Sequence, residues 1–144
     1  MEVKIKKVNP SAIIPVYSKS GDAGMDLTAV TLQVTDEGRY IYDTGLAFEI
    51  PEGYVGLVFP RSSISKMDLL LSNSVGVIDS GYRGTVKIVF VGADYEPARY
   101  AVGDRVAQIM ILPYPQINFI EDGELSNSER GKGGFGSTGI KGSL

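Results

Sequence analysis

The sequence predicts an all-β protein of one domain, and three observations lead to this fold class. Apolar residues alternate with polar residues over short runs, at the period of a strand rather than of a helix. Turn-forming Gly, Pro, Asp and Ser residues separate these runs at short intervals. No helical stripe is sustained over several turns. We therefore expect a jelly-roll-like distorted barrel with at most one short helix, over residues 62–67, and a flexible C-terminal arm.

The expected strands follow one another along the whole chain. The first alternates Val3, Ile5 and Val8 with polar residues, and the same alternation recurs over residues 40–42 and 86–90. More continuous apolar runs, bounded by turn residues, predict the remaining strands. These runs lie at residues 46–50, 54–59, 75–78, 106–112 and 117–120.

Composition excludes several kinds of chemistry. The 144 residues contain neither Cys nor His. Disulfides, a thiolate nucleophile, a Ser-His-Asp triad and a His-based metal site are therefore ruled out. Any metal has to be bound by oxygen atoms, which favours Mg²⁺, Mn²⁺ or Ca²⁺.

Charge and hydropathy indicate which partners are not expected. The net charge is −3 with no basic run, so we expect no nucleic-acid partner. No apolar stretch approaches the roughly 20 residues of a membrane span, and residues 1–7 lack the apolar core of a signal peptide. We expect no membrane partner and a cytoplasmic location, which is the host cell's cytoplasm if the source is viral.

The end of the chain has a different composition. Five glycines lie between residues 131 and 139, where a flexible linker is the ordinary interpretation. Linkers seldom carry an arginine, a phenylalanine and hydroxyl side chains among their glycines, which favours an arm that becomes ordered over a ligand. We divide the chain into a β-barrel core, residues 1–121, and a C-terminal arm, residues 122–144.

Four further clusters are candidates for chemistry: residues 23–29, 60–65, 76–84 and 103–109. Each has an ordinary structural interpretation when it is considered alone. Asp26 could cap a turn, Arg61 could lie in a solvated loop, and Asp79 could end a strand. Asp104 and Arg105 could form a surface ion pair of little energetic value.

Together the five clusters resemble, in order and separation, the five motifs of the homotrimeric deoxyuridine triphosphatases (dUTPases). The resemblance runs from about Ala23 to Gly139. It implies a jelly-roll homotrimer whose active sites each draw residues from all three subunits. It also implies Mg²⁺-dependent hydrolysis of dUTP to dUMP and pyrophosphate, which limits uracil in DNA and supplies dUMP for dTMP synthesis.

The resemblance assigns roles in binding and hydrolysing the triphosphate. Asp79 corresponds to the general base that activates water, and Asp26 to an acid that acts on phosphate-bound Mg²⁺ through water. A carboxylate is also the only ordinary base left near neutral pH in a chain without His. Guanidinium, amide, hydroxyl and main-chain donors are suited to phosphate oxygens. The expected phosphate-binding residues are Arg61, Ser62, Ser63, Gln108, Arg130, Gly136, Ser137 and Thr138.

The resemblance also assigns recognition of the nucleoside. Tyr82 corresponds to the tyrosine that packs under the deoxyribose, where a 2′-hydroxyl would be left without a partner. Phe135 corresponds to the aromatic residue that covers the uracil ring. Main-chain groups of Thr85, Val86 and Lys87 are expected to read the uracil edge.

The chain departs from the family pattern at a few positions, and two alternatives remain. Met25 stands where the first motif often has Tyr, Ser63 where the second often has Gly, and Gly81 where the third often has an acid. One alternative is a dCTP deaminase-like enzyme of the same fold, which would need a glutamate that activates water. The other is a dUTP-binding trimer without turnover.

Overall fold

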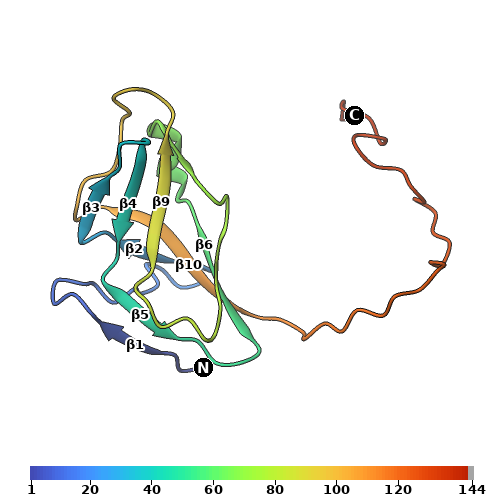
Figure 1. Cartoon of the computed structure of the whole chain (residues 1–144), viewed down its shortest axis with the longest axis horizontal. Helices are drawn as coiled ribbons and strands as arrows, with labels where there is room; N and C mark the ends of the chain where they lie inside the picture. Colours follow the sequence, from blue (N-terminus) through green and yellow to red (C-terminus); the bar gives the residue numbers. More distant parts are fainter. Residues whose placement is uncertain (143–144) are drawn as a thin grey trace.

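The computed structural model describes residues 1–142. Its regular elements are ten strands and one 3-10 turn (Figure 1). Along the chain these are β1 (Lys4–Lys7), β2 (Met25–Thr28), β3 (Thr31–Val34), β4 (Arg39–Asp43), β5 (Leu46–Glu49), β6 (Tyr54–Phe59), η1 (Ser62–Lys66), β7 (Leu69–Leu71), β8 (Gly76–Ile78), β9 (Lys87–Gly92) and β10 (Arg105–Pro113).

The strands form three antiparallel sheets. The two larger sheets have the strand orders β2-β10-β6-β8 and β3-β4-β9-β7, and β1 pairs with β5 in a third. The predicted all-β fold class is confirmed, and the one expected helical segment is the 3-10 turn η1. Within residues 1–142, no helix is long and apolar enough to cross a membrane.

The hydrophobic core lies between the two larger sheets. On β4, Tyr40 and Tyr42 are buried, while the residue between them is only partly buried, as strand alternation requires. Ile88 and Phe90 on β9 alternate in the same way. The opposite sheet contributes the fully buried residues Leu27, Val106, Ala107 and Ile109. Burying one such large apolar side chain stabilises the fold by about 1.5–3 kcal/mol.

The strand expected over residues 117–120 is wrong. A strand needs a neighbour with which to form a hydrogen-bonded ladder, and the chain after β10 extends away from the barrel (Figure 1). Ile117, Phe119 and Ile120 are all exposed there. Their alternation therefore has no partner within this chain.

Three short strands were not expected from the sequence. β2 lies inside the first candidate cluster, where its residues were interpreted only as a motif. β7 is the apolar run Leu69–Leu71, which has no alternation to distinguish it from a turn. β3 has four residues with only weak alternation. Each is stabilised by a longer neighbouring strand, which local pattern cannot reveal.

The corner between β4 and β5 fixes the start of β9. Thr44 is fully buried, and both its backbone N–H and its hydroxyl donate to the Val86 carbonyl, at 3.1 and 2.8 Å. The Val86 N–H in turn donates to the Leu46 carbonyl at 2.8 Å. These bonds position the turn that precedes β9.

We expect replacement of Tyr42 by Phe to change the stability at alkaline pH. The Tyr42 hydroxyl is buried and donates to the Tyr100 carbonyl at 2.7 Å, and burial raises the pKa of Tyr42 to about 12. An unfolded tyrosine loses its proton near pH 10, so stability present below about pH 10 is lost as the pH rises towards 12. Between about pH 9 and pH 11 this loss is about 1 kcal/mol in the native chain and absent in Y42F. Urea unfolding of both proteins at the two pH values measures it, and equal slopes would contradict the assignment.

Candidate active site

An open cleft of about 910 Å³ lies on the outer face of the sheet that contains β2, β10 and β6. Its walls come from β2, from the end of β6 with the start of η1, and from β10. The charged and amide side chains that line it are Lys19, Asp22, Asp26, Arg61, Arg105 and Gln108. The cleft therefore brings together residues of the first, second and fourth candidate clusters.

Strand register explains why these side chains share one face. Gln108 lies opposite Asp26 on one side and opposite Phe59 on the other. Opposed residues of antiparallel strands point to the same face of the sheet. Their chain neighbours Leu27 and Ile109 are fully buried, so Asp26 and Gln108 must face outward.

An irregularity in β10 brings Arg105 to the same face. Regular alternation would place Arg105 and Gln108 on opposite faces, because they are three positions apart. The register between β10 and β2 shifts between Arg105 and Ala107, and both Val106 and Ala107 are buried. A bulge of this kind changes the direction of a side chain, and it directs Arg105 towards Asp26.

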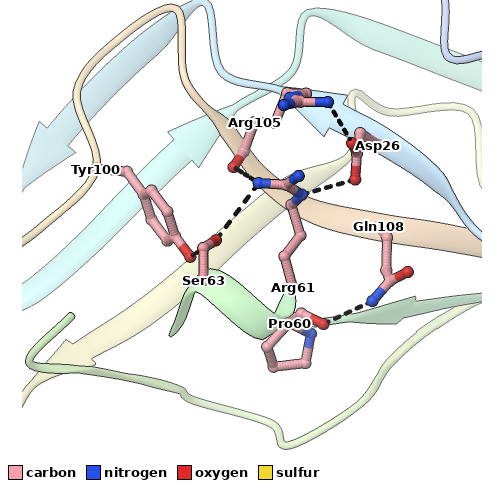
Figure 2. A network of polar contacts seen from close by, with 7 residues as sticks. All are labelled: Asp26, Pro60, Arg61, Ser63, Tyr100, Arg105 and Gln108. Carbon is pink, nitrogen blue, oxygen red and sulfur yellow. Dashed lines mark hydrogen bonds and ion pairs between the residues drawn. The ribbon is translucent and has the colours of Figure 1, made fainter. Parts of the chain in front are cut away.

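Asp26 is the acidic centre of the cleft. Its Oδ1 accepts from Arg61 Nε at 2.7 Å, and its Oδ2 from Arg105 Nη1 at 3.0 Å (Figure 2). One carboxylate thereby allows two like-charged guanidinium groups to lie side by side. Gln108 is held separately, because its Nε2 donates to the Pro60 carbonyl at 2.9 Å. Chemically, such a cluster can offer cationic donors to a ligand with several anionic oxygens.

The donor set does not form a metal cage. Among the residues that the structure describes, no group of three or more acidic side chains is placed to bind a metal ion. Both oxygens of Asp26 accept from arginines. The residues therefore fit a cation that arrives with a phosphate ligand and keeps most of its waters, as Mg²⁺ does.

Asp79 lies far from this cleft within one chain. Ile78 on β8 pairs with Gly56, so Asp79 follows next to the start of β6, whereas Arg61 follows its end. About six extended residues lie between the level of Asp79 and Arg61 along β6, which corresponds to a distance of about 20 Å. Asp79 is exposed at the end of β8. The candidate base and the candidate phosphate site are therefore not neighbours in the single chain.

The turn after Asp79 has a defined internal structure. The Tyr82 N–H donates to the Asp79 carbonyl at 3.1 Å, and the Tyr82 hydroxyl to the Thr85 carbonyl at 3.0 Å. The tyrosine ring lies directly over Gly84, where a Cβ atom would be only 2.7 Å from Tyr82 Cζ. Thr85 Oγ1 donates to Asp43 Oδ2 at 3.0 Å, which ties the turn to the end of β4.

The main chain of Val86 differs from the expectation. Val86 is buried, its N–H donates to Leu46, and its carbonyl accepts twice from Thr44. These groups already form hydrogen bonds within the fold, so in this conformation they are not available to bind a nucleobase. Thr85 is partly buried and Lys87 is exposed at the start of β9.

The arm residues lie apart from the cleft and from the turn after Asp79. The chain from Tyr114 onward curves away from the barrel (Figure 1). Phe135 is fully exposed, and the barrel contacts neither its ring nor the neighbouring glycines. The single chain does not bring these candidates together with the cleft; they are Arg130, Phe135, Gly136, Ser137 and Thr138. Residues 143–144 of the expected arm lie outside the described residues.

Two cations of the cleft were not assigned from the sequence. For Arg105, an ion pair with Asp104 was one possible interpretation; in the structure Arg105 pairs with Asp26, and Asp104 Oδ2 accepts from the Ala101 N–H at 2.8 Å. The bulge that turns Arg105 leaves no mark in the residue pattern. Lys19 lies in an irregular loop that carried no motif.

Comparison with known proteins agrees with this architecture. The family model described as dUTPase matches residues 10–139. Deoxyuridine 5'-triphosphate nucleotidohydrolase from Nautilia profundicola is 43% identical, covering 96% of this chain and 99% of its own. The enzyme of the same name from Hydrogenobaculum sp. is 38% identical, covering 98% and 100%. The structure of Staphylococcus bacteriophage 80alpha dUTPase with dUPNHPP superposes with a TM-score of 0.84 at 28% identity, covering 96% and 99%.

The fold and the cleft define an all-β protein with a cleft lined by arginine, lysine, acidic and amide side chains on the outer face of one sheet. The matched region spans most of the chain and contains every residue of that cleft. The chain belongs to the dUTPase family.

We expect Gly24→Ala to disturb the cleft without unfolding the protein. A Cβ atom at Gly24 would lie 2.5 Å from Gln108 Oε1, the far end of a side chain that can move. The amide then leaves its place beside Pro60 while the sheets keep their packing. We expect pyrophosphate to bind about tenfold more weakly to G24A by calorimetric titration, the loss of about one charge-assisted hydrogen bond.

Gly123→Ala is the matched control, since a Cβ atom there meets no atom within 4 Å. Its affinity and its unfolding midpoint should equal those of the native chain. Native affinity in G24A, with Gln108 displaced in its crystal structure, would show that the amide does not bind phosphate.

Proposed function

We propose that this protein hydrolyses dUTP to dUMP and pyrophosphate. The observation that carries the proposal is the convergence of Asp26, Arg61 and Gln108, from three separate motifs, on one cleft. The named relatives, which span nearly the whole chain, support the same reaction. A water molecule attacks the α-phosphorus, its proton passes to a base, and the bond to the bridging oxygen between the α- and β-phosphorus breaks.

The cleft binds the triphosphate in this proposal. Arg61, the Ser62 hydroxyl and the main-chain N–H groups at Ser62 and Ser63 contact phosphate oxygens. Gln108 contributes its amide. A guanidinium fork matches two phosphate oxygens at once, which a protein of net charge −3 needs locally to offset substrate repulsion. The γ-phosphate end of the triphosphate is bound by four residues of the arm: Arg130, Gly136, Ser137 and Thr138.

Asp26 would hold, through water, an Mg²⁺ ion that arrives with the triphosphate. The ion would neutralise charge on the phosphate oxygens in the transition state. Because Asp26 already accepts from two arginines, its main task is to keep their guanidinium groups oriented towards the substrate.

The nucleoside lies against the turn at the end of β8. Asp79 is the general base for the attacking water. The Tyr82 ring, fixed over Gly84 by its bond to Thr85, packs against the deoxyribose. Main-chain groups at Thr85 and Lys87 recognise the edge of the uracil ring. A 2′-hydroxyl against the ring face would be buried without a partner, which costs about 1–3 kcal/mol.

The active site is shared between subunits of a homotrimer in this proposal. Asp79 lies beside the start of β6 and Arg61 follows its end, about 20 Å away, yet both must reach one nucleotide. The arm, residues 122–144, supplies Phe135, which stacks on uracil at the site formed by other subunits. Stacking on an aromatic ring is worth about 1–3 kcal/mol and offsets part of the cost of ordering the glycines.

A cytoplasmic location stays a prediction of the sequence.

Pyrophosphate release from dUTP, UTP, dTTP and dCTP tests the reaction. We expect a strong preference for dUTP and loss of turnover with a chelator. Asp79→Asn should bind dUTP normally and lower kcat by about 10²–10⁴-fold, because the base is lost while the ligand contacts remain. Ammonia release from dCTP would favour a deaminase instead, and dUTP binding without pyrophosphate a binding protein. Native kcat in D79N would remove Asp79 from its role.

Mixed trimers test the shared site. Asp79→Asn and Arg61→Ala each disable every site when present alone. When the two variants are refolded together, some sites combine a native Asp79 from one subunit with a native Arg61 from another. We expect activity to reappear on mixing; a site contained within one subunit would stay inactive at every ratio.

A further inference from the structure

Tyr100 links the hydrophobic core to the cleft. The residue is 3% exposed, and its carbonyl accepts from the Tyr42 hydroxyl at 2.7 Å. Its ring packs against Tyr42 and Phe90, with centroids 6.3 and 6.0 Å away. The ring is therefore fixed on two sides by residues of β4 and β9.

The hydroxyl of Tyr100 leaves this core and reaches η1. Its oxygen lies 2.9 Å from Ser63 Oγ, and Ser63 Oγ also accepts from Arg61 Nη1 at 3.4 Å (Figure 2). A serine hydroxyl can serve both neighbours, because it has one proton to donate and two lone pairs to accept with. The result is a continuous hydrogen-bonded path from the core to the Arg61 guanidinium.

This path supplies an additional anchor for Arg61. Asp26 holds Nε at 2.7 Å, while the Arg105 carbonyl and Ser63 Oγ both accept from Nη1 at 3.4 Å. Without Ser63, the two remaining acceptors both lie on the side of β2 and β10. Ser63 adds a contact from a separate element, η1, and Tyr100 keeps Ser63 in place.

We propose that Tyr100 is a positioning residue for phosphate binding, acting on Arg61 through Ser63. The inference rests on the proposed function of Arg61. Ser63 stands where the family pattern often has glycine, which has no hydroxyl. The hydrogen bonds of the Ser63 hydroxyl to Tyr100 and Arg61 therefore depend on this departure from the pattern. A guanidinium held in place beforehand loses less side-chain freedom when the phosphate binds. Tyr100 therefore affects substrate affinity more than the chemical step.

Four proteins test this role: the native chain, Tyr100→Phe, Ser63→Ala and the double variant. Each variant lacks the Ser63–Tyr100 hydrogen bond, so each should raise KM for dUTP by about threefold to tenfold with kcat within about twofold. The double variant should raise KM no further than Ser63→Ala does, because both substitutions break the same path. Tyr114→Phe is the control, since its hydroxyl accepts only from Gln116 in an exposed segment.

Binding of inorganic pyrophosphate to the same proteins gives a readout that does not need turnover. We expect its affinity to fall by the same factor as KM rises. Lower unfolding midpoints with unchanged KM and unchanged pyrophosphate affinity would overturn the inference and leave Tyr100 a packing residue. Effects of the two single variants that multiply in the double variant would also overturn it. A native chain that binds pyrophosphate but does not hydrolyse dUTP would refute the proposed function, while the binding series would still decide the role of Tyr100.

Discussion

The pairing of β10 with β2 and β6 is the constraint on which the cleft depends. Gln108 is fixed opposite both Asp26 and Phe59, so residues distant in the chain are brought to one face of one sheet. The bulge at the start of β10 then adds Arg105 to that face. Because sheet register allows no intermediate positions, these side chains are placed by the backbone ladder and need little help from their own packing.

Charge in the cleft is organised around a single carboxylate. Asp26 accepts from Arg61 and Arg105, which would otherwise repel each other. Partly exposed ion pairs contribute little to stability, so the value of this arrangement lies in the orientation of the guanidinium groups. Ser63 and Tyr100 connect this cluster to the core, where the buried aromatic ring of Tyr100 rigidly supports a polar contact at the surface.

The sequence predicted much of the fold because strand alternation is a local property. Tyr40 and Tyr42, and Ile88 and Phe90, were placed correctly from their spacing alone. The same pattern failed at residues 117–120, where alternation is present but a neighbouring strand is not. Arg61 and Gln108 were identified as candidates through their motifs, whereas Arg105 received no site role because its direction depends on a bulge.

By itself, the sequence determined the all-β class, since strand alternation follows from residue type and spacing. It also supplied candidate residues for an oxygen-rich anion, through their chemistry and the resemblance of their motifs to one family. Only the tertiary structure decided which of those residues meet. It placed Asp26, Arg61 and Arg105 in one network, used the main chain of Val86 within the barrel, and put Asp79 beside the opposite end of β6. The physical reason is that strand register and bulges are set by pairing between distant segments, which no local pattern records.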